Sequence, residues 1–149
     1  MAILLIGFMA SGKTSYGRCL AKKLDKEFYD LDELISQKIQ MSIDQYFSLY
    51  GQASFRRVEE ELLETYIKED IVLATGGGVV ESEINQKLIQ QNRNNIYLQS
   101  DFLSLYKRME IDNENIRPLF KNNSYKELEK IYQRRLPIYE DLATEIISN

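Results

Sequence analysis

The sequence of 149 residues contains no histidine, no tryptophan and a single cysteine. One cysteine excludes an internal disulfide and a zinc site built from cysteines, and the lack of histidine removes the commonest metal ligand and the commonest general base. Acid–base chemistry therefore falls to carboxylates. Cys19 has no second cysteine or histidine to work with, which favours a small buried apolar residue over a reactive thiol.

The chain also lacks an excess of basic residues and any long apolar run. Its net charge is -4 and its sequence pI is about 5.0, so a nucleic-acid partner is not expected and an anionic substrate must meet locally placed arginines. No run approaches transmembrane length and no signal-peptide pattern is present, which predicts no membrane contact and a cytoplasmic location. The length predicts one domain, residues 1–149, and we expect a monomer.

Near the N-terminus, an apolar run leads into a glycine-rich loop. Residues 2–6 predict a buried parallel strand, and residues 7–14, Gly-Phe-Met-Ala-Ser-Gly-Lys-Thr, match G-x-x-x-x-G-K-[ST] at every fixed position. In such a loop, backbone N–H groups and the positive end of the next helix bind phosphate. We expect an exposed Lys13 to reach the β- and γ-phosphates and the Thr14 hydroxyl to ligate Mg²⁺. The alternative is a chance match, which the flanking strand and helix disfavour.

The remaining sequence alternates predicted strands with predicted helices. Apolar runs predict further strands at residues 27–30, 71–75, 95–98 and 143–148. Helical spacing predicts helices from the loop to residue 24 and at 32–39, 42–49, 53–67, 81–91, 101–109 and 124–142. The alternation predicts a three-layer α/β fold with a mostly parallel five-stranded sheet flanked by helices, and ligands at the carboxyl ends of the strands.

Several local patterns within these helices predict which residues are buried. Tyr16, Leu20 and Leu24 recur at helical spacing and are expected to face the core, whereas the acidic run of residues 59–61 is expected to form a solvated face. Pro137 should kink the last helix or end its first half. Two further segments are read as breaks: Gly51, which ends a helix, and the polar residues 110–123, which suit a mobile flap.

Two aspartates follow the strand at residues 27–30. A phosphate-binding loop needs a carboxylate on the metal side, and the strand at 71–75 ends in glycines, so Asp30 and Asp32 are the candidates. Their spacing of two places both side chains on one side of an extended backbone. The alternative is that Asp32 only caps the next helix, which would leave Asp30 unexplained.

Glycines and arginines supply the other candidate site residues. Gly76, Gly77 and Gly78 follow a buried strand, which suggests close approach of a ligand to the backbone, with a plain flexible turn as the alternative. Lone arginines on helices are usually solvated or paired with neighbouring acids, and on spacing alone a role in binding stays open for Arg56, Arg57, Arg117, Arg134 and Arg135.

At this point the sequence resembles the shikimate kinases. The resemblance spans almost the whole chain and rests on motifs in the order and spacing of that family. Besides the loop of residues 7–14, they are Phe28-Tyr29-Asp30-Leu31-Asp32, Ser42-Ile43 with Phe47, Phe55-Arg56-Arg57-Val58-Glu59, Thr75-Gly76-Gly77-Gly78, Arg117-Pro118-Leu119 and Arg134-Arg135-Leu136-Pro137-Ile138-Tyr139.

The resemblance implies a P-loop kinase fold and ATP-dependent phosphorylation of the 3-hydroxyl of shikimate in aromatic amino-acid biosynthesis, with Mg²⁺ as cofactor. It implies a substrate-binding helical region at about residues 31–62 and a lid at about residues 110–123. The implied catalytic residues are Lys13, Asp32 and Arg117. The implied ATP-binding residues are Ala10, Ser11, Gly12, Lys13, Thr14, Ser15, Arg108 and Arg117. The implied substrate-binding residues are Asp32, Arg56, Gly76, Gly77, Gly78 and Arg135, and Mg²⁺ would meet Thr14 and, through water, Asp30.

One departure concerns the C-terminus, because members of the family usually continue into an adenine-side loop and a closing helix, whereas this sequence ends at Asn149. Either the sequence stops at an ordered boundary or part of the nucleotide pocket is missing. Two other functions stay open: another P-loop small-molecule kinase, such as a gluconate or nucleoside monophosphate kinase, and a nucleotide-binding module without turnover. Phe55-Arg56-Arg57 and Arg135 favour an acceptor that bears a carboxylate.

Overall fold

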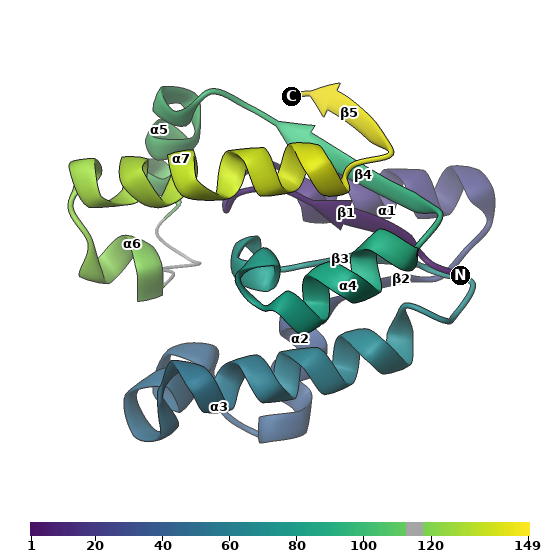
Figure 1. Cartoon of the computed structure of the whole chain (residues 1–149), viewed down its shortest axis with the longest axis horizontal. Coiled ribbons are helices and arrows are strands. Elements are labelled where there is room, and N and C mark those ends of the chain that lie inside the picture. Colours follow the sequence, from purple (N-terminus) through teal and green to yellow (C-terminus); the bar gives the residue numbers. More distant parts are fainter. Residues whose placement is uncertain (113–117) are drawn as a thin grey trace.

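The computed structural model describes residues 1–112 and 118–149. Within these ranges strands and helices alternate (Figure 1). The first half contains β1 (Ile3–Ile6), α1 (Lys13–Leu24), β2 (Phe28–Asp30), α2 (Leu31–Ile39), α3 (Ile43–Tyr66) and β3 (Val72–Ala74). The second half contains the 3₁₀ helix η1 (Gly77–Glu81), α4 (Glu83–Gln91), β4 (Asn94–Gln99), α5 (Phe102–Ile111), α6 (Pro118–Asn122), α7 (Tyr125–Leu142) and β5 (Glu145–Ser148).

The strands form one parallel sheet in the order β2-β3-β1-β4-β5. The central strand β1 pairs with β3 on one side, Leu4 opposite Leu73, and with β4 on the other, Leu4 opposite Asn95. The predicted three-layer α/β fold is confirmed, and the sheet is parallel throughout rather than mostly. Since parallel strands end at the same edge, the segments after β1, β2 and β3 meet there.

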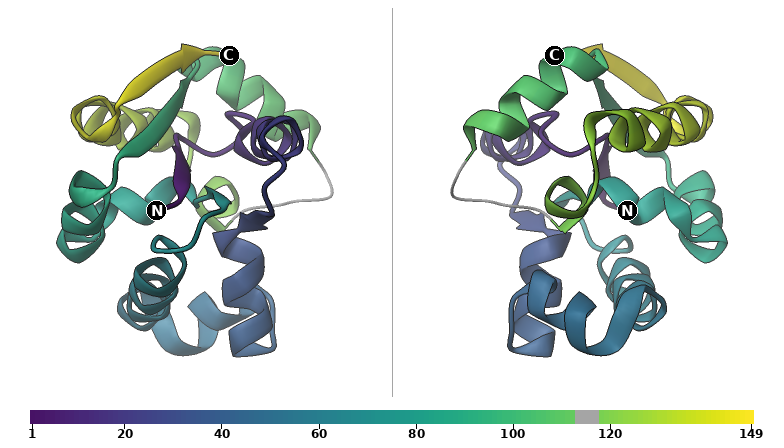
Figure 2. Two further views of the ribbon diagram at one scale, coloured as in Figure 1. Left: turned by 90° about the vertical axis from the view of Figure 1, so that its right-hand side faces the viewer. Right: turned by 90° about the vertical axis from the view of Figure 1, so that its left-hand side faces the viewer.

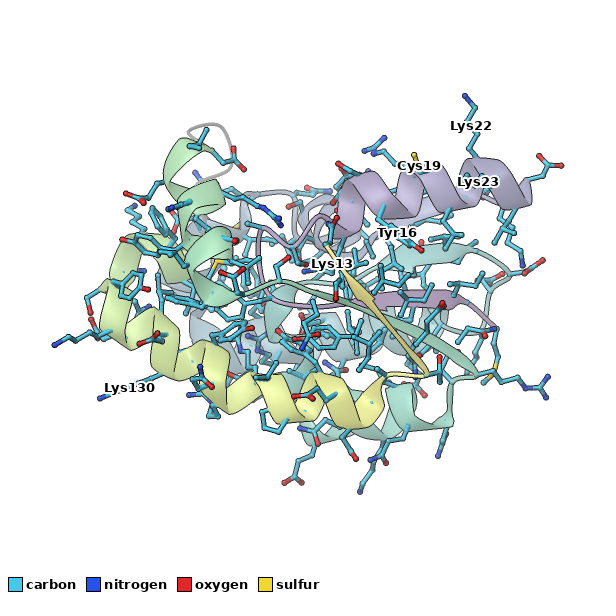
Figure 3. All side chains as sticks on the ribbon, turned by 90° about the horizontal axis from the view of Figure 1, so that it is seen from above. Lys13, Tyr16, Cys19, Lys22, Lys23 and Lys130 are labelled. Carbon is cyan, nitrogen blue, oxygen red and sulfur yellow. The ribbon has the colours of Figure 1, made fainter. Side chains whose placement is uncertain are left out.

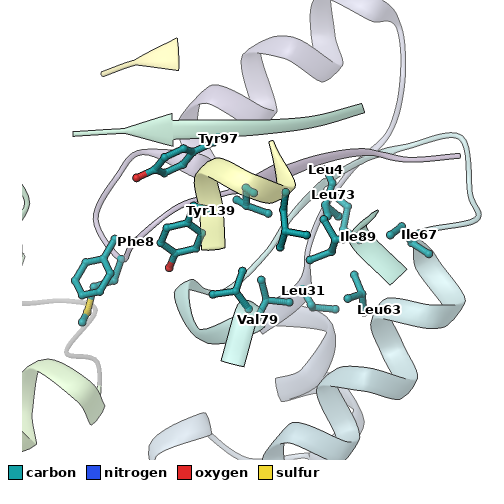
Figure 4. Close-up of a cluster of buried hydrophobic side chains, with 14 of the residues drawn as sticks. Leu4, Phe8, Leu31, Leu63, Ile67, Leu73, Val79, Ile89, Tyr97 and Tyr139 are labelled. Atoms are coloured by element: carbon teal, nitrogen blue, oxygen red, sulfur yellow. The ribbon is translucent and has the colours of Figure 1, made fainter. Parts of the chain in front are cut away.

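Side chains of the central strand alternate between two cores. Leu4 and Ile6 point into a large cluster with helices α3, α4, α5 and α7, whereas Leu5 points into a smaller cluster with α1. Figure 3 shows α1 on one side of the sheet and α7 on the other. In the large cluster Tyr97 stacks on Tyr139 with ring centroids 5.1 Å apart (Figure 4). Each fully buried leucine contributes about 1.5–3 kcal/mol by leaving water.

Helices α2 and α3 lie at the opposite end of the molecule from β5 (Figure 2). They form a helical layer beside the carboxyl end of β2. Gly51 has φ 82° and ψ 173° inside α3, so the two helices predicted on either side of it are confirmed as arms that meet at a kink. The first arm begins with a capping box of Ser42 and Gln45.

Three burial predictions are wrong. Cys19 is exposed, and Leu24 is 44% exposed, because Gly17 and Ala21 take the buried face of α1 in their place. A methyl group on Gly17 would collide with Phe28, so α1 packs close to β2 only with glycine there. Glu59, expected on a solvated face, is buried with 1% of its surface exposed.

Several predicted element boundaries also differ from the structure. The last helix is an exception: α7 runs through Pro137 to Leu142, in agreement with the predicted range 124–142, so Pro137 does not end its first half. The helix predicted from residue 81 begins at Glu83 after the cap Ser82, and Glu81 belongs to η1. The predicted flap, residues 110–123, includes the last turn of α5 and all of α6, while residues 113–117 lie outside the described part. In the described ranges, no helix is long and apolar enough to cross a membrane.

Candidate active site

A cleft of about 990 Å³ opens at the carboxyl ends of β1, β2 and β3. It collects every site residue that the family resemblance implies except Arg117, which falls outside the described residues; the candidates Arg57 and Arg134 do not line it. These lining residues come from separate parts of the chain: Ala10, Ser11, Gly12, Lys13, Thr14, Ser15, Asp30, Asp32, Arg56, Gly76, Gly77, Gly78, Arg108 and Arg135.

The glycine-rich loop wraps around the side chain of Lys13. Its ammonium group donates hydrogen bonds to the carbonyl oxygens of Gly7 at 2.7 Å and Phe8 at 2.9 Å. Gly12, with φ 94°, occupies the cap position of α1, a conformation that favours glycine. Lys13 is only 9% exposed, so the prediction of an exposed loop lysine is wrong. Its charge lies where the backbone N–H groups at the start of α1 also concentrate positive potential.

Asp30 connects the loop to the helix that follows β2. Its Oδ1 accepts from the backbone N–H of Asp32 at 2.9 Å and so caps α2, while its Oδ2 accepts from the Thr14 hydroxyl at 3.0 Å. The capping role considered for Asp32 therefore belongs to Asp30. Asp32 lies in the first turn of α2 and lines the cleft.

The glycine turn after β3 packs directly against two charged side chains of the cleft. A methyl group at Gly76 would lie 2.8 Å from Oδ1 of Asp32, and one at Gly78 would collide with the guanidinium of Arg56. Larger residues would push both groups out of place. The glycines thus permit close approach of protein side chains to the backbone, in addition to any ligand.

Arg56 is held by a buried carboxylate. Its Nη1 donates to Oε1 of Glu59 at 2.9 Å, and Nδ2 of Asn85 on α4 donates to the same oxygen at 3.3 Å. Burial raises the pKa of Glu59 to about 7, although Arg56 acts in the opposite direction. Nε of Arg56 is buried and has no hydrogen-bond partner.

Arg135 approaches the same cleft from α7. Its side chain is 5% exposed, and its guanidinium carbon lies 5.7 Å from the centre of the Phe8 ring, a cation–π contact. Nη2 donates to Oε2 of Glu81 at 3.2 Å, and Nε is buried without a partner. Two guanidinium groups thus flank the glycine turn, each with a buried Nε that has no hydrogen-bond partner among the described residues.

Arg108 lies on the other side of the loop, on α5. Its Nη1 donates to the carbonyl oxygen of Ala10 at 3.2 Å, and its Nη2 donates to that of Asn149 at 3.1 Å. The Asn149 side chain in turn donates to the carbonyl oxygen of Ser11 at 2.7 Å. These contacts place an exposed cation at the rim of the phosphate-binding loop.

Sequence reasoning missed the residues that hold the two cleft arginines. Phe55, Glu59 and Leu63 follow one another at intervals of four, which places Glu59 on the buried face of α3, so helical spacing could have revealed it. Glu81 and Asn85 carry no comparable signal, because their partners lie far away in the sequence and only the fold brings them together.

A parallel sheet with a phosphate-binding loop after its central strand, and a carboxylate bonded to the loop threonine, defines a P-loop kinase fold. A family model described as shikimate kinase matches residues 9–149. The shikimate kinase of Streptococcus gordonii is 45% identical over 148 residues, covering 99% of this chain and 89% of that protein. That of Streptococcus thermophilus is 43% identical over 151 residues, covering 99% and 90%.

Among solved structures, the shikimate kinase from Acinetobacter baumannii in complex with shikimate matches with a TM-score of 0.93 and 32% identity, covering 99% of this chain and 83% of that one. The chain belongs to the shikimate kinase family. The resemblance read from the motifs is thereby confirmed.

Proposed function

We propose that this protein transfers the γ-phosphoryl group of ATP to the 3-hydroxyl of shikimate, giving shikimate 3-phosphate and ADP, a step of aromatic amino-acid biosynthesis. The observation that carries the proposal is the composition of one cleft. A phosphate-binding loop on one side faces the half-buried Arg56 and the buried Arg135 on the other, and the buried Nε of each has no hydrogen-bond partner in the described part of the chain. A buried donor without a partner is costly, so a ligand that accepts from both is favoured.

On the nucleotide side, the loop and its lysine would bind the phosphates of ATP. The backbone N–H groups at the start of α1 and the ammonium of Lys13 place positive charge in the same part of the cleft, beside the phosphate-binding loop. Loose phosphoryl transfer depends mainly on positioning and charge neutralisation, which this group supplies without histidine. Arg108 would lie beside the adenine, since it already borders the loop through Ala10.

The residues beside the loop also fit Mg²⁺. Thr14 and Asp30 provide two hard oxygen donors in contact at 3.0 Å, and the described residues contain no cluster of three or more acidic, histidine or cysteine ligands. This matches an ion that keeps several waters and uses few protein ligands beside the phosphates. Thr14 would hold the ion directly and Asp30 through water. Bound there, Mg²⁺ would neutralise charge on the phosphate oxygens.

On the acceptor side, Arg56 and Arg135 would clamp the carboxylate of shikimate. Guanidinium groups bind planar carboxylates through paired N–H donors, and the glycine turn between them adds backbone groups. Asp32 would accept hydrogen bonds from the substrate hydroxyls and can take the proton of the attacking one. Residues at about 31–62 would form the acceptor-binding region.

The lid at about residues 110–123 would close over both substrates, with Arg117 reaching the phosphates. Leu119 and Asn122 of α6 line the cleft, which supports this part of the proposal. A monomeric state and a cytoplasmic location stay predictions from the sequence.

The test is a coupled assay of ADP release with shikimate, gluconate and AMP offered separately. We expect release with shikimate alone. Release with gluconate or AMP and none with shikimate would place the protein among other P-loop kinases. ATP binding without release with any acceptor would make it a binding module.

A further inference from the structure

Glu81 stands at the end of η1, the turn that starts with two of the glycines lining the cleft. It does not itself line the cleft. Its Oε2 accepts from Nη2 of Arg135 at 3.2 Å and also from Nη2 of Arg134, an arginine whose side chain is 57% exposed. The Glu81 carboxylate therefore links the glycine turn to Arg135, which lines the cleft.

Both ends of η1 are fixed to the same face of α7. At its start, the carbonyl oxygen of Gly77 accepts from the Tyr139 hydroxyl; at its end, Glu81 holds Arg135. Residues 135 and 139 are one helical turn apart and so lie on one face. The turn and the guanidinium thus form one assembly whose parts cannot shift independently.

The surroundings of Arg135 determine which of its N–H groups bond to the protein and which can meet a ligand in the cleft. A guanidinium that is only 5% exposed requires a compensating anion, which Glu81 provides. Burial by itself would raise the pKa of Glu81, but Arg135 and Arg134 outweigh it and hold the pKa below the ordinary value, so the group stays a carboxylate at neutral pH. Only Nη2 bonds to Glu81; Nε has no partner, and Nη1 would lie 3.6 Å from a methyl group on Gly77.

We propose that Glu81 is the positioning residue for substrate recognition: it anchors Arg135 through Nη2 so that the remaining donors meet the carboxylate of the acceptor. The proposal rests on the proposed function, because that carboxylate belongs to shikimate. Glu81 touches neither substrate nor ATP and acts through Arg135. Without it, the guanidinium gains rotamer freedom that binding must then remove.

The experiment compares Glu81→Ala, Glu81→Gln and Arg134→Gln with Glu140→Gln, an exposed glutamate of α7, as the matched control. KM for each substrate and kcat are measured by coupled assay, shikimate affinity without nucleotide by calorimetry, and folding by thermal melting. We expect Glu81→Ala to raise KM and Kd for shikimate about tenfold, with kcat and KM for ATP changed by less than about twofold. Glu81→Gln keeps an acceptor oxygen but loses the negative charge, so it should raise both constants for shikimate by a smaller factor than Glu81→Ala.

Arg134→Gln separates the two contacts of Glu81. Because Arg134 does not line the cleft, its loss should leave shikimate affinity near that of Glu140→Gln. The proposal is overturned if Glu81→Ala and Glu81→Gln bind shikimate as the wild type does, or if the constants for shikimate and ATP worsen together, as a general loss of structure would cause. If Glu81→Ala does not fold, Glu81→Gln, which preserves the shape of the side chain, is the test. It should raise KM and Kd for shikimate by a smaller factor, and unchanged constants would overturn the proposal. A wild type that neither binds nor phosphorylates shikimate would remove the proposed function and this inference together.

Discussion

Glu59 accepts a hydrogen bond from Arg56 at 2.9 Å while only 1% of its own side chain is exposed. Its pKa is raised from 4.5 to about 7, chiefly by burial. Below about pH 4.5 the carboxyl is protonated in both folded and unfolded chains. Between that pH and about 7 the unfolded chain releases the proton and the folded chain keeps it. The free energy of unfolding should therefore decrease as pH rises through this window.

We expect Glu59→Gln to remove this pH dependence. The difference in the free energy of unfolding between wild type and variant should change by about 3 kcal/mol at most between pH 4.5 and 7, because the pKa shift is about 2.5. Above pH 7 this difference should stay constant. Urea unfolding at half-unit pH steps measures it. Glu64→Gln, at an exposed position of the same helix, is the control. Parallel curves for wild type and Glu59→Gln would show that the pKa of Glu59 is the same in the folded and unfolded chains.

Lys13→Ala should abolish turnover and also lower stability. The sequence alone suggested an exposed lysine that could be removed without cost to the fold. In the structure, the Lys13 ammonium donates hydrogen bonds to the carbonyl oxygens of Gly7 and Phe8. The substitution would leave these oxygens without a charged donor. We expect a loss of about 1–3 kcal/mol, measured by thermal and urea unfolding, with Lys22→Ala on the same helix as control. Unchanged stability would show that water replaces the ammonium without penalty.

The sequence predicts those parts of the site whose residues form a motif within one short stretch of the chain. The phosphate-binding loop is one uninterrupted motif, and the structure places all of its predicted residues in the cleft. Asp30 and Asp32 were predicted as a pair, but their division of labour was not, because the choice of cap depends on backbone geometry: Asp30 is extended at φ -109°. A sequence pattern does not distinguish two aspartates two residues apart in this respect.

The errors arise where tertiary contacts override local pattern. Glu59 sits in a run of acids that reads as a solvated face, yet Arg56 and Asn85 make it a buried anchor. Cys19 was assigned to the core on composition, although Gly17 allows Phe28 to cover the other face of α1. Pro137, by contrast, does not end α7, which matches the predicted helix of residues 124–142 closely.

Arg56→Lys and Arg135→Lys should each raise the requirement for shikimate far more than that for ATP. Lysine keeps the charge but loses the second donor of the guanidinium fork, and the buried Nε of each arginine disappears. A cost of about 1–3 kcal/mol corresponds to roughly five- to a hundredfold in KM for shikimate. Arg57→Lys, at the exposed neighbouring position, is the control. Equal changes in both KM values would assign these arginines to a general structural role.

Hydrogen exchange in α6 should slow when an ATP analogue and shikimate are bound together. Leu119 and Asn122 line the cleft, and Lys121 lies 3.5 Å from Asp44 at the start of α3, so α6 can close on the acceptor-binding region. Exposed pairs of this kind are worth no more than about 1 kcal/mol, which leaves the helix free to open without ligands. Exchange is followed in the backbone amides of residues 119–123, with α4 as an internal reference. Equal protection with and without both ligands would remove α6 from the lid.

Asp32→Asn should be the most damaging conservative change in the cleft, and worse for turnover than for binding. Because Asp30 and not Asp32 caps α2, the helix cap does not require a carboxylate at position 32. Asparagine is nearly the same size, and Gly76 leaves room for it as for aspartate. An amide, however, cannot take the proton of the attacking hydroxyl.

Loose phosphoryl transfer reduces the need for a strong base, so the expected loss in turnover for Asp32→Asn is about 10² to 10⁴, with only modest weakening of shikimate binding. The measurement is the single-turnover rate at saturating shikimate, beside the melting temperature. Glu33→Gln, in the same turn of α2 and also lining the cleft, serves as the control for loss of a negative charge there, because its 3.8 Å pair with Arg18 is largely solvated. If Asp32→Asn and Glu33→Gln react at rates within a few-fold of the wild type, Asp32 only positions the substrate and the proton leaves by another route, such as directly to the transferred phosphoryl group.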